Sequence, residues 1–122
     1  MKNILIVDDD LGFIFWLGTA LIAAGYRAWP ASSSSEAISF VGRKPATRLD
    51  LLIVNASLPG VSKLIAHLHR TQVHLNVMAV GPQGTLPGVN YFQATPGLMD
   101  DAAKEEWVRA VKRMSGKQNR AA

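Results

Sequence analysis

Hydrophobic residues in this chain gather in short, continuous runs that end at polar or turn-forming residues. Three such runs occupy residues 3–7, 51–54 and 76–80. Runs of this length and pattern are typical of strands that are buried on both faces, as in parallel sheets. Two weaker segments, 26–29 and 89–94, are expected to complete a sheet with the second and fifth strands.

Segments with helical length and helix-ending residues lie between the predicted strands. Gly25 follows the first segment, and the serines at 32–35 can cap the second. Strands that alternate with helices predict an α/β domain whose parallel sheet carries helices on both faces. The expected helices cover residues 11–24, about 36–41, 62–70 and 98–114.

The alternation breaks after the fourth strand. Residues 81–88 are rich in glycine and proline, which disfavours an ordinary helix. The segment is also short, since one helical turn takes about 3.6 residues in addition to its entry and exit. We therefore expect no α-helix between the fourth and fifth strands. The sheet face beside the fifth strand should be thinly covered, or covered by a neighbouring chain.

Composition limits the class of protein. The chain has 122 residues, of which 48% are hydrophobic, and this suits one domain with a substantial core. It has no cysteine, so disulfides and thiolate chemistry are excluded. The start does not have the pattern of a signal peptide, and no apolar run reaches the roughly 18 residues of a membrane span. We expect a cytoplasmic protein with one domain at 1–114 and a flexible basic tail at 115–122.

Polar residues stand where the predicted strands end. Asp8 and Asp9 follow the first strand, and Asn55 ends the third. Open α/β sheets bind their ligands at the carboxyl ends of the strands. A carboxylate at position 55 could act as a nucleophile or a metal ligand, whereas an amide is neutral and a poor nucleophile. An inert group therefore occupies the most favourable position for chemistry.

Several of these segments together resemble the receiver domain of two-component response regulators. The resemblance rests on 4–10, on 24–26, on 31–37 and on 50–60, and more loosely on Thr95-Pro96. It implies a flavodoxin-like, doubly wound parallel sheet of order 2-1-3-4-5, with the first and last helices on one face. In this chain the family's fourth helix would be missing or reduced to a loop. The resemblance also implies a cis bond before the proline, where the family has Lys-Pro.

The resemblance also assigns roles in the pocket. In receivers, an aspartate after the third strand accepts a phosphoryl group, and an acidic pair helps to hold magnesium. A hydroxyl after the fourth strand and a lysine after the fifth bind the phosphoryl oxygens. Here Asp8 and Asp9 keep the acidic pair, Asn55 replaces the acceptor, Gly81 lacks the hydroxyl, and Thr95, before Pro96, lacks the charge.

These replacements predict a degenerate pocket. Phosphoryl transfer depends on positioning and on neutralising the charge of the oxygens, and the chain has lost the nucleophile, a donor and the cation. We therefore expect no phosphorylation, no catalytic residue and no resident cofactor. Magnesium, if it binds Asp8 and Asp9 at all, should bind weakly, because one carboxylate has become an amide.

The first predicted helix has no charged residue. The receiver register points Phe13, Leu17, Ala20, Leu21 and Ala24 toward the sheet. The outer face would then carry the apolar or small residues Ile14, Phe15, Gly18 and Ile22. A helix that is apolar all round is normally buried all round. We predict an interface on this outer face, with a second copy of the chain or with another protein.

The predicted function is that of a stand-alone receiver-like protein in phosphorelay signalling. It would act as a phosphorylation-independent interaction module rather than as an enzyme, with a histidine kinase, a phosphotransfer protein or a second copy as partner. Two alternatives stay open. One is a phosphoacceptor that uses another residue, such as Ser57. The other is nucleic-acid binding through the basic C-terminal end, although the net charge of +4 fits a solvated tail better.

Overall fold

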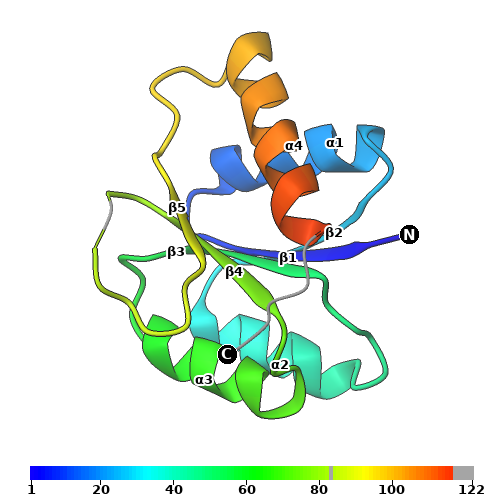
Figure 1. The fold of residues 1–122 in the computed structure, drawn as a ribbon, viewed down its shortest axis with the longest axis vertical. Coiled ribbons are helices and arrows are strands. Elements are labelled where there is room, and N and C mark those ends of the chain that lie inside the picture. Colours follow the sequence, from blue (N-terminus) through cyan, green and yellow to red (C-terminus); the bar gives the residue numbers. More distant parts are fainter. Residues whose placement is uncertain (83, 117–122) are drawn as a thin grey trace.

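The five strands described below form one parallel sheet in the order 2-1-3-4-5, as the receiver resemblance implied. The computed structural model describes residues 1–82 and 84–116 (Figure 1). The elements are β1 (Asn3–Val7), α1 (Leu11–Ala23), β2 (Arg27–Ala31), α2 (Ser34–Arg43), β3 (Leu51–Asn55), α3 (Val61–Thr71), β4 (Asn76–Val80), β5 (Tyr91–Gln93) and α4 (Asp101–Ser115).

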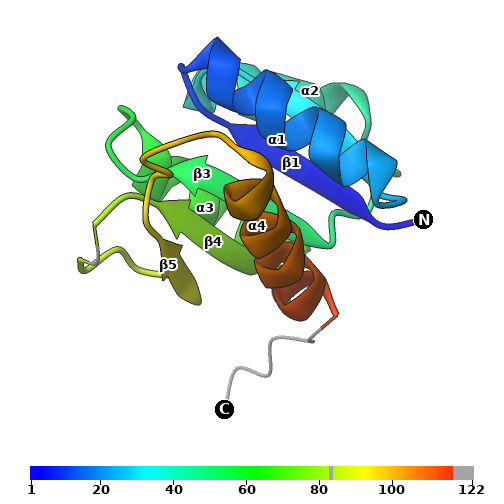
Figure 2. The same ribbon diagram turned by 90° about the horizontal axis from the view of Figure 1, so that it is seen from above.

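Helices cover both faces of the sheet. Helices α1 and α4 lie side by side on one face, and α2 and α3 cover the other (Figures 1 and 2). Residues of β1 alternate between the two hydrophobic cores: Ile4 and Ile6 face α1 and α4, whereas Leu5 and Val7 face α2 and α3. Such strands have no polar face, which explains why their sequences read as continuous apolar runs.

Side-chain caps set where the helices begin. The Asp10 carboxylate accepts a hydrogen bond from the backbone nitrogen of Phe13 at 3.1 Å and so starts α1. Asp100 accepts from Ala103 in the same way at 2.9 Å, so α4 begins at Asp101 and not at residue 98 as predicted. The Ser33 hydroxyl starts α2 two residues earlier than expected.

The connection between β4 and β5 contains no α-helix within residues 81–82 and 84–90, as predicted. The loop partly replaces the missing helix, because Leu86 and Val89 pack on the core beneath α2 and α3. Gly88 touches α3 so closely that an added Cβ would lie 2.7 Å from Cγ2 of Ile65. The backbone there has a φ of +85°, which favours glycine. The loop is therefore seated on α3.

Strand β5 is shorter than the predicted segment at 89–94. Asn90 lies before it and extends the pairing with β4: its backbone nitrogen donates to the Val77 oxygen at 2.9 Å, and its side-chain oxygen accepts from the Val77 nitrogen at 2.8 Å. The bond between Thr95 and Pro96 is trans, so the prediction of a cis bond is wrong. The trans form is favoured by about 0.5–1 kcal/mol, and the exposed Thr95 offers no buried contact that would offset this preference.

The end of α4 alters the expected start of the tail. Ser115 still belongs to the helix and is buried, and its backbone oxygen accepts a hydrogen bond from the Lys2 ammonium at 2.7 Å. The rest of the predicted tail, 117–122, lies outside the described residues. Across the part of the chain that the structure describes, no helix combines the length and hydrophobicity of a membrane crossing.

Candidate functional site

Asp8 and Asn55 are in direct contact at the carboxyl edge of the sheet. They follow the neighbouring strands β1 and β3, and the Asn55 amide nitrogen donates to Oδ1 of Asp8 at 3.2 Å. The Asp8 side chain is almost fully enclosed, with 4% of the residue exposed. The backbone nitrogen of Asp10 donates to the same oxygen at 3.0 Å. The buried carboxylate is thus held by two donors from this chain.

The other end of the Asn55 amide is also engaged. Its oxygen accepts hydrogen bonds from the backbone nitrogen and from the hydroxyl of Ser57, at 2.9 and 2.7 Å. This is an Asx-turn, in which a side-chain oxygen binds the backbone two residues later. The amide orientation follows from its neighbours, since the reverse would set its oxygen against the Asp8 oxygen. The result is a chain of hydrogen bonds from Ser57 through Asn55 to Asp8.

The remaining predicted pocket residues follow the carboxyl ends of β1, β4 and β5. Asp9 is exposed next to Asp8, and Thr95 is exposed two residues beyond β5. Pro96 is half-buried. Gly81 follows β4, and its backbone nitrogen donates to the Gln93 oxygen at 2.9 Å. The carboxyl ends of parallel strands share one edge of the sheet, so all of these residues follow strands that end at that edge.

The pocket offers few groups that could hold a metal. Among the described residues, no three or more histidine, aspartate or glutamate side chains are grouped so as to bind an ion. Asp8 and Asp9 are the candidate ligands, and weak or absent magnesium binding remains a prediction. His67, His69 and His74 do not form such a group; His69, for example, contacts the Leu75 backbone oxygen at 2.9 Å.

Sequence reasoning missed the part that Ser57 plays. It was considered as a phosphoacceptor, whereas the structure shows it as a donor to Asn55. An asparagine at the end of a strand with a serine two residues later is the signal that could have revealed this turn. The amide oxygen of Asn55 is a poor base, so it does not activate the Ser57 hydroxyl for attack.

The outer face of α1 is exposed, but its residues differ from those predicted. Phe15 and Ile22 are 73% and 59% exposed, as expected, and Gly18 is partly exposed. Leu11 was missed and is 68% exposed. The prediction for Ile14 is wrong, because this side chain is buried in the core under α1 and α4.

Helical spacing explains the correction. Ile14 lies three and seven residues before Leu17 and Leu21, so all three share the sheet-facing side. Ala24, predicted to face the sheet, is exposed because α1 ends at Ala23. The exposed face consists of Leu11, Phe15, Gly18 and Ile22, which follow one another at spacings of four, three and four. We call these four residues the α1 stripe.

Known proteins resemble this chain in sequence over part of its length. No model of a protein family matches it. The transcriptional regulatory protein GlrR of Escherichia coli (strain K12) is 28% identical over 87 residues, which cover 70% of this chain. Those residues are 19% of the relative, so the chain matches about a fifth of that protein's length.

Solved structures match the whole fold. A protein of Chloroflexus aurantiacus J-10-fl assigned to the response regulators is 26% identical, with a TM-score of 0.73 over 95% of this chain and 98% of that one. A CheY-like receiver domain protein of Methanospirillum hungatei JF-1 has a TM-score of 0.77 at 18% identity, over 95% and 94% of the two chains. The response regulator TrrA of Thermotoga maritima, solved in complex with the histidine kinase ThkA, gives 0.66 at 18% identity over 91% and 98%.

The sequence motifs, the strand order and these relatives agree with one another. The order β2-β1-β3-β4-β5 is that of the CheY-like fold, and Asp8 and Asn55 are hydrogen-bonded at the carboxyl edge of this sheet. The chain therefore has the receiver fold and is similar to response regulators in both sequence and structure.

Proposed function

We propose that this domain acts in two-component signalling as a protein-interaction module that is not phosphorylated. In this proposal it is cytoplasmic, is not an enzyme and needs no resident cofactor. The observation that carries it is the hydrogen bond from the Asn55 amide to the enclosed Asp8 carboxylate. A donor stands where receivers have the carboxylate that accepts the phosphoryl group.

The electrostatics of the pocket support this proposal. Two carboxylates at hydrogen-bond distance repel each other unless a cation or a proton lies between them. The Asn55 amide turns that repulsion into attraction, and the Asp10 backbone nitrogen adds a second donor to the same Asp8 oxygen. Two donors from the chain itself therefore stabilise the charge on Oδ1 of Asp8.

The reactivity of the pocket points the same way. The Asn55 oxygen is occupied by two donors from Ser57, and an amide is a poor nucleophile. Gly81 supplies no hydroxyl and Thr95 no positive charge to neutralise transferring oxygens. Since catalysis of phosphoryl transfer consists largely of such positioning and neutralisation, the site lacks the means to speed the reaction.

The partners in this proposal are proteins. The related fold in TrrA was solved in complex with a histidine kinase. We propose a histidine kinase, a phosphotransfer protein or a second copy of this chain as the partner here. The α1 stripe is the surface for contact, because it is apolar, exposed and uncharged.

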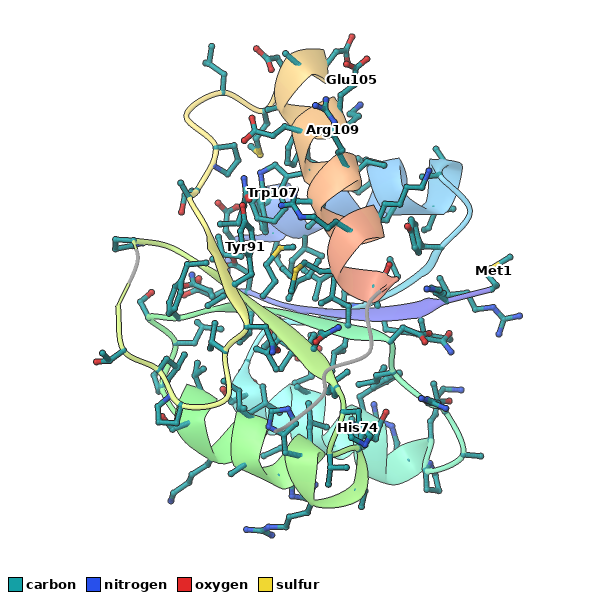
Figure 3. The ribbon with its side chains drawn as sticks, in the orientation of Figure 1. Met1, His74, Tyr91, Glu105, Trp107 and Arg109 are labelled. Carbon is teal, nitrogen blue, oxygen red and sulfur yellow. The ribbon has the colours of Figure 1, made fainter. Side chains whose placement is uncertain are left out.

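The nucleic-acid alternative gains no support from the described residues. Near the C-terminal end, the Arg113 guanidinium lies 5.4 Å from the centre of the Tyr91 ring on β5, so this charge is packed against the protein itself. Figure 3 shows Tyr91 on the side of the sheet that α4 covers. A cation held over an aromatic ring in this way contributes to folding and is less available for phosphates.

Incubation with acetyl phosphate and magnesium, followed by intact mass measurement, tests the proposal. We expect the mass to stay unchanged. A stable adduct of one phosphoryl group would overturn the proposal, and peptide mapping would then ask whether Ser57 carries it. Ser57→Ala is the matched variant, because it removes that hydroxyl and leaves the Asn55 contact with Asp8 in place.

A further inference from the structure

The α1 stripe is an apolar surface of unusual continuity for a folded domain. Leu11, Phe15 and Ile22 are each more than half exposed, and residues 11–23 include no charged side chain. Beside the stripe lies a groove of about 550 Å³ between α1 and α4, with Thr19, Ala20 and Ala23 as its α1 wall. Large exposed apolar patches on folded proteins mark sites of association.

We propose that the α1 stripe binds a second copy of this chain, with the two α1 helices antiparallel about a two-fold axis between Gly18 and Thr19. This goes beyond the proposed function, which requires only that some protein binds. In this register, two residues of the paired helices lie opposite each other when their residue numbers add up to 37. Phe15 therefore packs on the partner's Ile22, and the symmetry repeats the contact.

The middle of the stripe allows the close approach that this register needs. Gly18 lies opposite the partner's Thr19, and no atom lies within 4 Å of where a Cβ on Gly18 would be. The Thr19 hydroxyl does not compete for the interface, because it is bonded to the Phe15 and Trp16 backbone oxygens at 2.9 and 3.1 Å. Two helix backbones can thus come together with small groups between them.

Charge favours a second copy in the antiparallel direction. The N-terminal end of α1 carries the exposed acidic residues Asp9 and Asp10. Beyond the C-terminal end lies the exposed Arg27, and Arg109 and Lys112 line the groove next to Ala23. Figure 3 shows Arg109 projecting from α4. In an antiparallel pair, the acidic end of each helix lies near the basic end of the other, so the attraction occurs at both ends of the interface. In a parallel pair, acidic ends would lie together and basic ends would lie together.

The two ends also explain why a second copy fits better than an unrelated helix. The antiparallel pair brings Asp10, the N-cap of α1, toward the C-terminal end of the partner's α1, beyond which Arg27 begins β2. The groove, with Lys104 and Glu105 on its α4 wall, runs along Thr19, Ala20 and Ala23 and so borders the half of the stripe that meets the partner's Phe15. The direction that pairs Phe15 with Ile22 therefore also brings the acidic end of each α1 toward the basic end of its partner.

Disulfide trapping in the full chain tests the register, because the chain has no cysteine of its own. A single Thr19→Cys variant should form a covalent dimer under mild oxidation, and a mixture of Phe15→Cys and Ile22→Cys chains should form a mixed dimer. Phe15→Cys alone should stay unlinked, since its two copies would be offset along the axis by about 10 Å, seven residues at 1.5 Å each. A disulfide spans at most about 7 Å between Cα atoms.

Sedimentation velocity tests the association itself. We expect the wild type to show the dimer mass and the double variant Phe15→Glu/Ile22→Glu to lose it, because each new carboxylate would lie opposite another on the partner. Circular dichroism shows whether both proteins are folded. Leu98→Glu is the matched control, because this exposed apolar residue lies in the loop before α4 and should leave the dimer intact.

Two outcomes would overturn the inference. One is a wild type that stays monomeric up to about 100 µM, a concentration at which even modest affinities are detected. The other is efficient linkage of Phe15→Cys chains to one another, which requires a parallel or shifted pair. Neither outcome affects the mass measurement with acetyl phosphate. The absence of phosphorylation in the proposed function is therefore tested independently of the dimer.

Discussion

Phe13 of α1 and Trp107 of α4 pack edge to face, with ring centroids 5.3 Å apart and ring planes at 70°. Both side chains are buried in the core on this face of the sheet, and Figure 3 shows Trp107 pointing inward from α4. The contact joins the first helix of the chain to the last. Since the two helices share this core, loss of either ring should weaken the whole domain.

Replacing Phe13 by alanine should lower the free energy of unfolding by about 3–5 kcal/mol, because a buried ring is lost and a cavity remains. Denaturant unfolding followed by tryptophan fluorescence measures the loss. Phe15→Ala is the matched control two residues away, since Phe15 is 73% exposed. In dilute protein its effect should stay within about 0.5 kcal/mol. Equal effects of the two variants would show that the Phe13 contact contributes little.

Replacing Asn55 by aspartate should make the domain depend on divalent cations. The new carboxylate would face Asp8 where the Asn55 amide now donates at 3.2 Å, so stability in EDTA should fall by about 1–3 kcal/mol. Magnesium should restore part of the loss in this variant and leave the wild type unchanged. Thermal melts with and without magnesium provide the measurement.

Asn90→Asp serves as the control for that experiment. The Asn90 side-chain oxygen accepts from the Val77 backbone nitrogen, and a carboxylate can accept the same bond. We expect its melting temperature to be independent of magnesium. If both variants respond equally to the ion, the effect is general and the Asn55 interpretation is wrong.

Asn55→Asp alone should not regain efficient phosphorylation by acetyl phosphate. The acceptor would be restored, but position 81 would still lack a hydroxyl and position 95 a cation. Adding Thr95→Lys should raise the phosphorylated fraction seen by intact mass. Robust labelling of the single variant would mean that these two groups matter less than we argue.

Gly88→Ala should destabilise the domain by about 1–3 kcal/mol. The new Cβ would lie 2.7 Å from Cγ2 of Ile65, and the φ of +85° strains any other residue. Gly84→Ala, in the same loop, meets no atom within 4 Å and should be nearly neutral. Chemical denaturation of both variants compares them directly, and equal stabilities would show that the loop is not seated on α3.

The sheet could be predicted from the sequence because each central strand has a continuous apolar run with one asparagine at its end. Strands β1 and β4 have the expected bounds, and β3 adds only Asn55 to the apolar run. The pairing of Asp8 with Asn55 followed from their places at the ends of adjacent strands. The absence of a helix between β4 and β5 followed from glycine and proline, whose backbone limits are local.

The rest depended on packing that a linear pattern does not contain. Helix α1 has no polar face to fix its rotation about its axis, so no change from apolar to polar residues marks Leu11 as exposed. The burial of Ile14, by contrast, could have been read from its helical spacing to Leu17 and Leu21. The start of α4 depended on the Asp100 cap, while Leu98 and Met99 looked like helix-forming apolar residues. The hydrogen bonds of Ser57 to Asn55 depended on a turn whose signal is only two residues long.

The hydrogen bond between Asn55 and Asp8 has a consequence for how such a protein could be controlled. The amide belongs to an encoded asparagine, so a kinase cannot add it and a phosphatase cannot remove it. In the function proposed here, the amount of complex would follow from the concentrations of the domain and its partner and from their affinity. The cell would then set the amount of this complex through synthesis and degradation of the protein. Such control acts over minutes to generations rather than seconds.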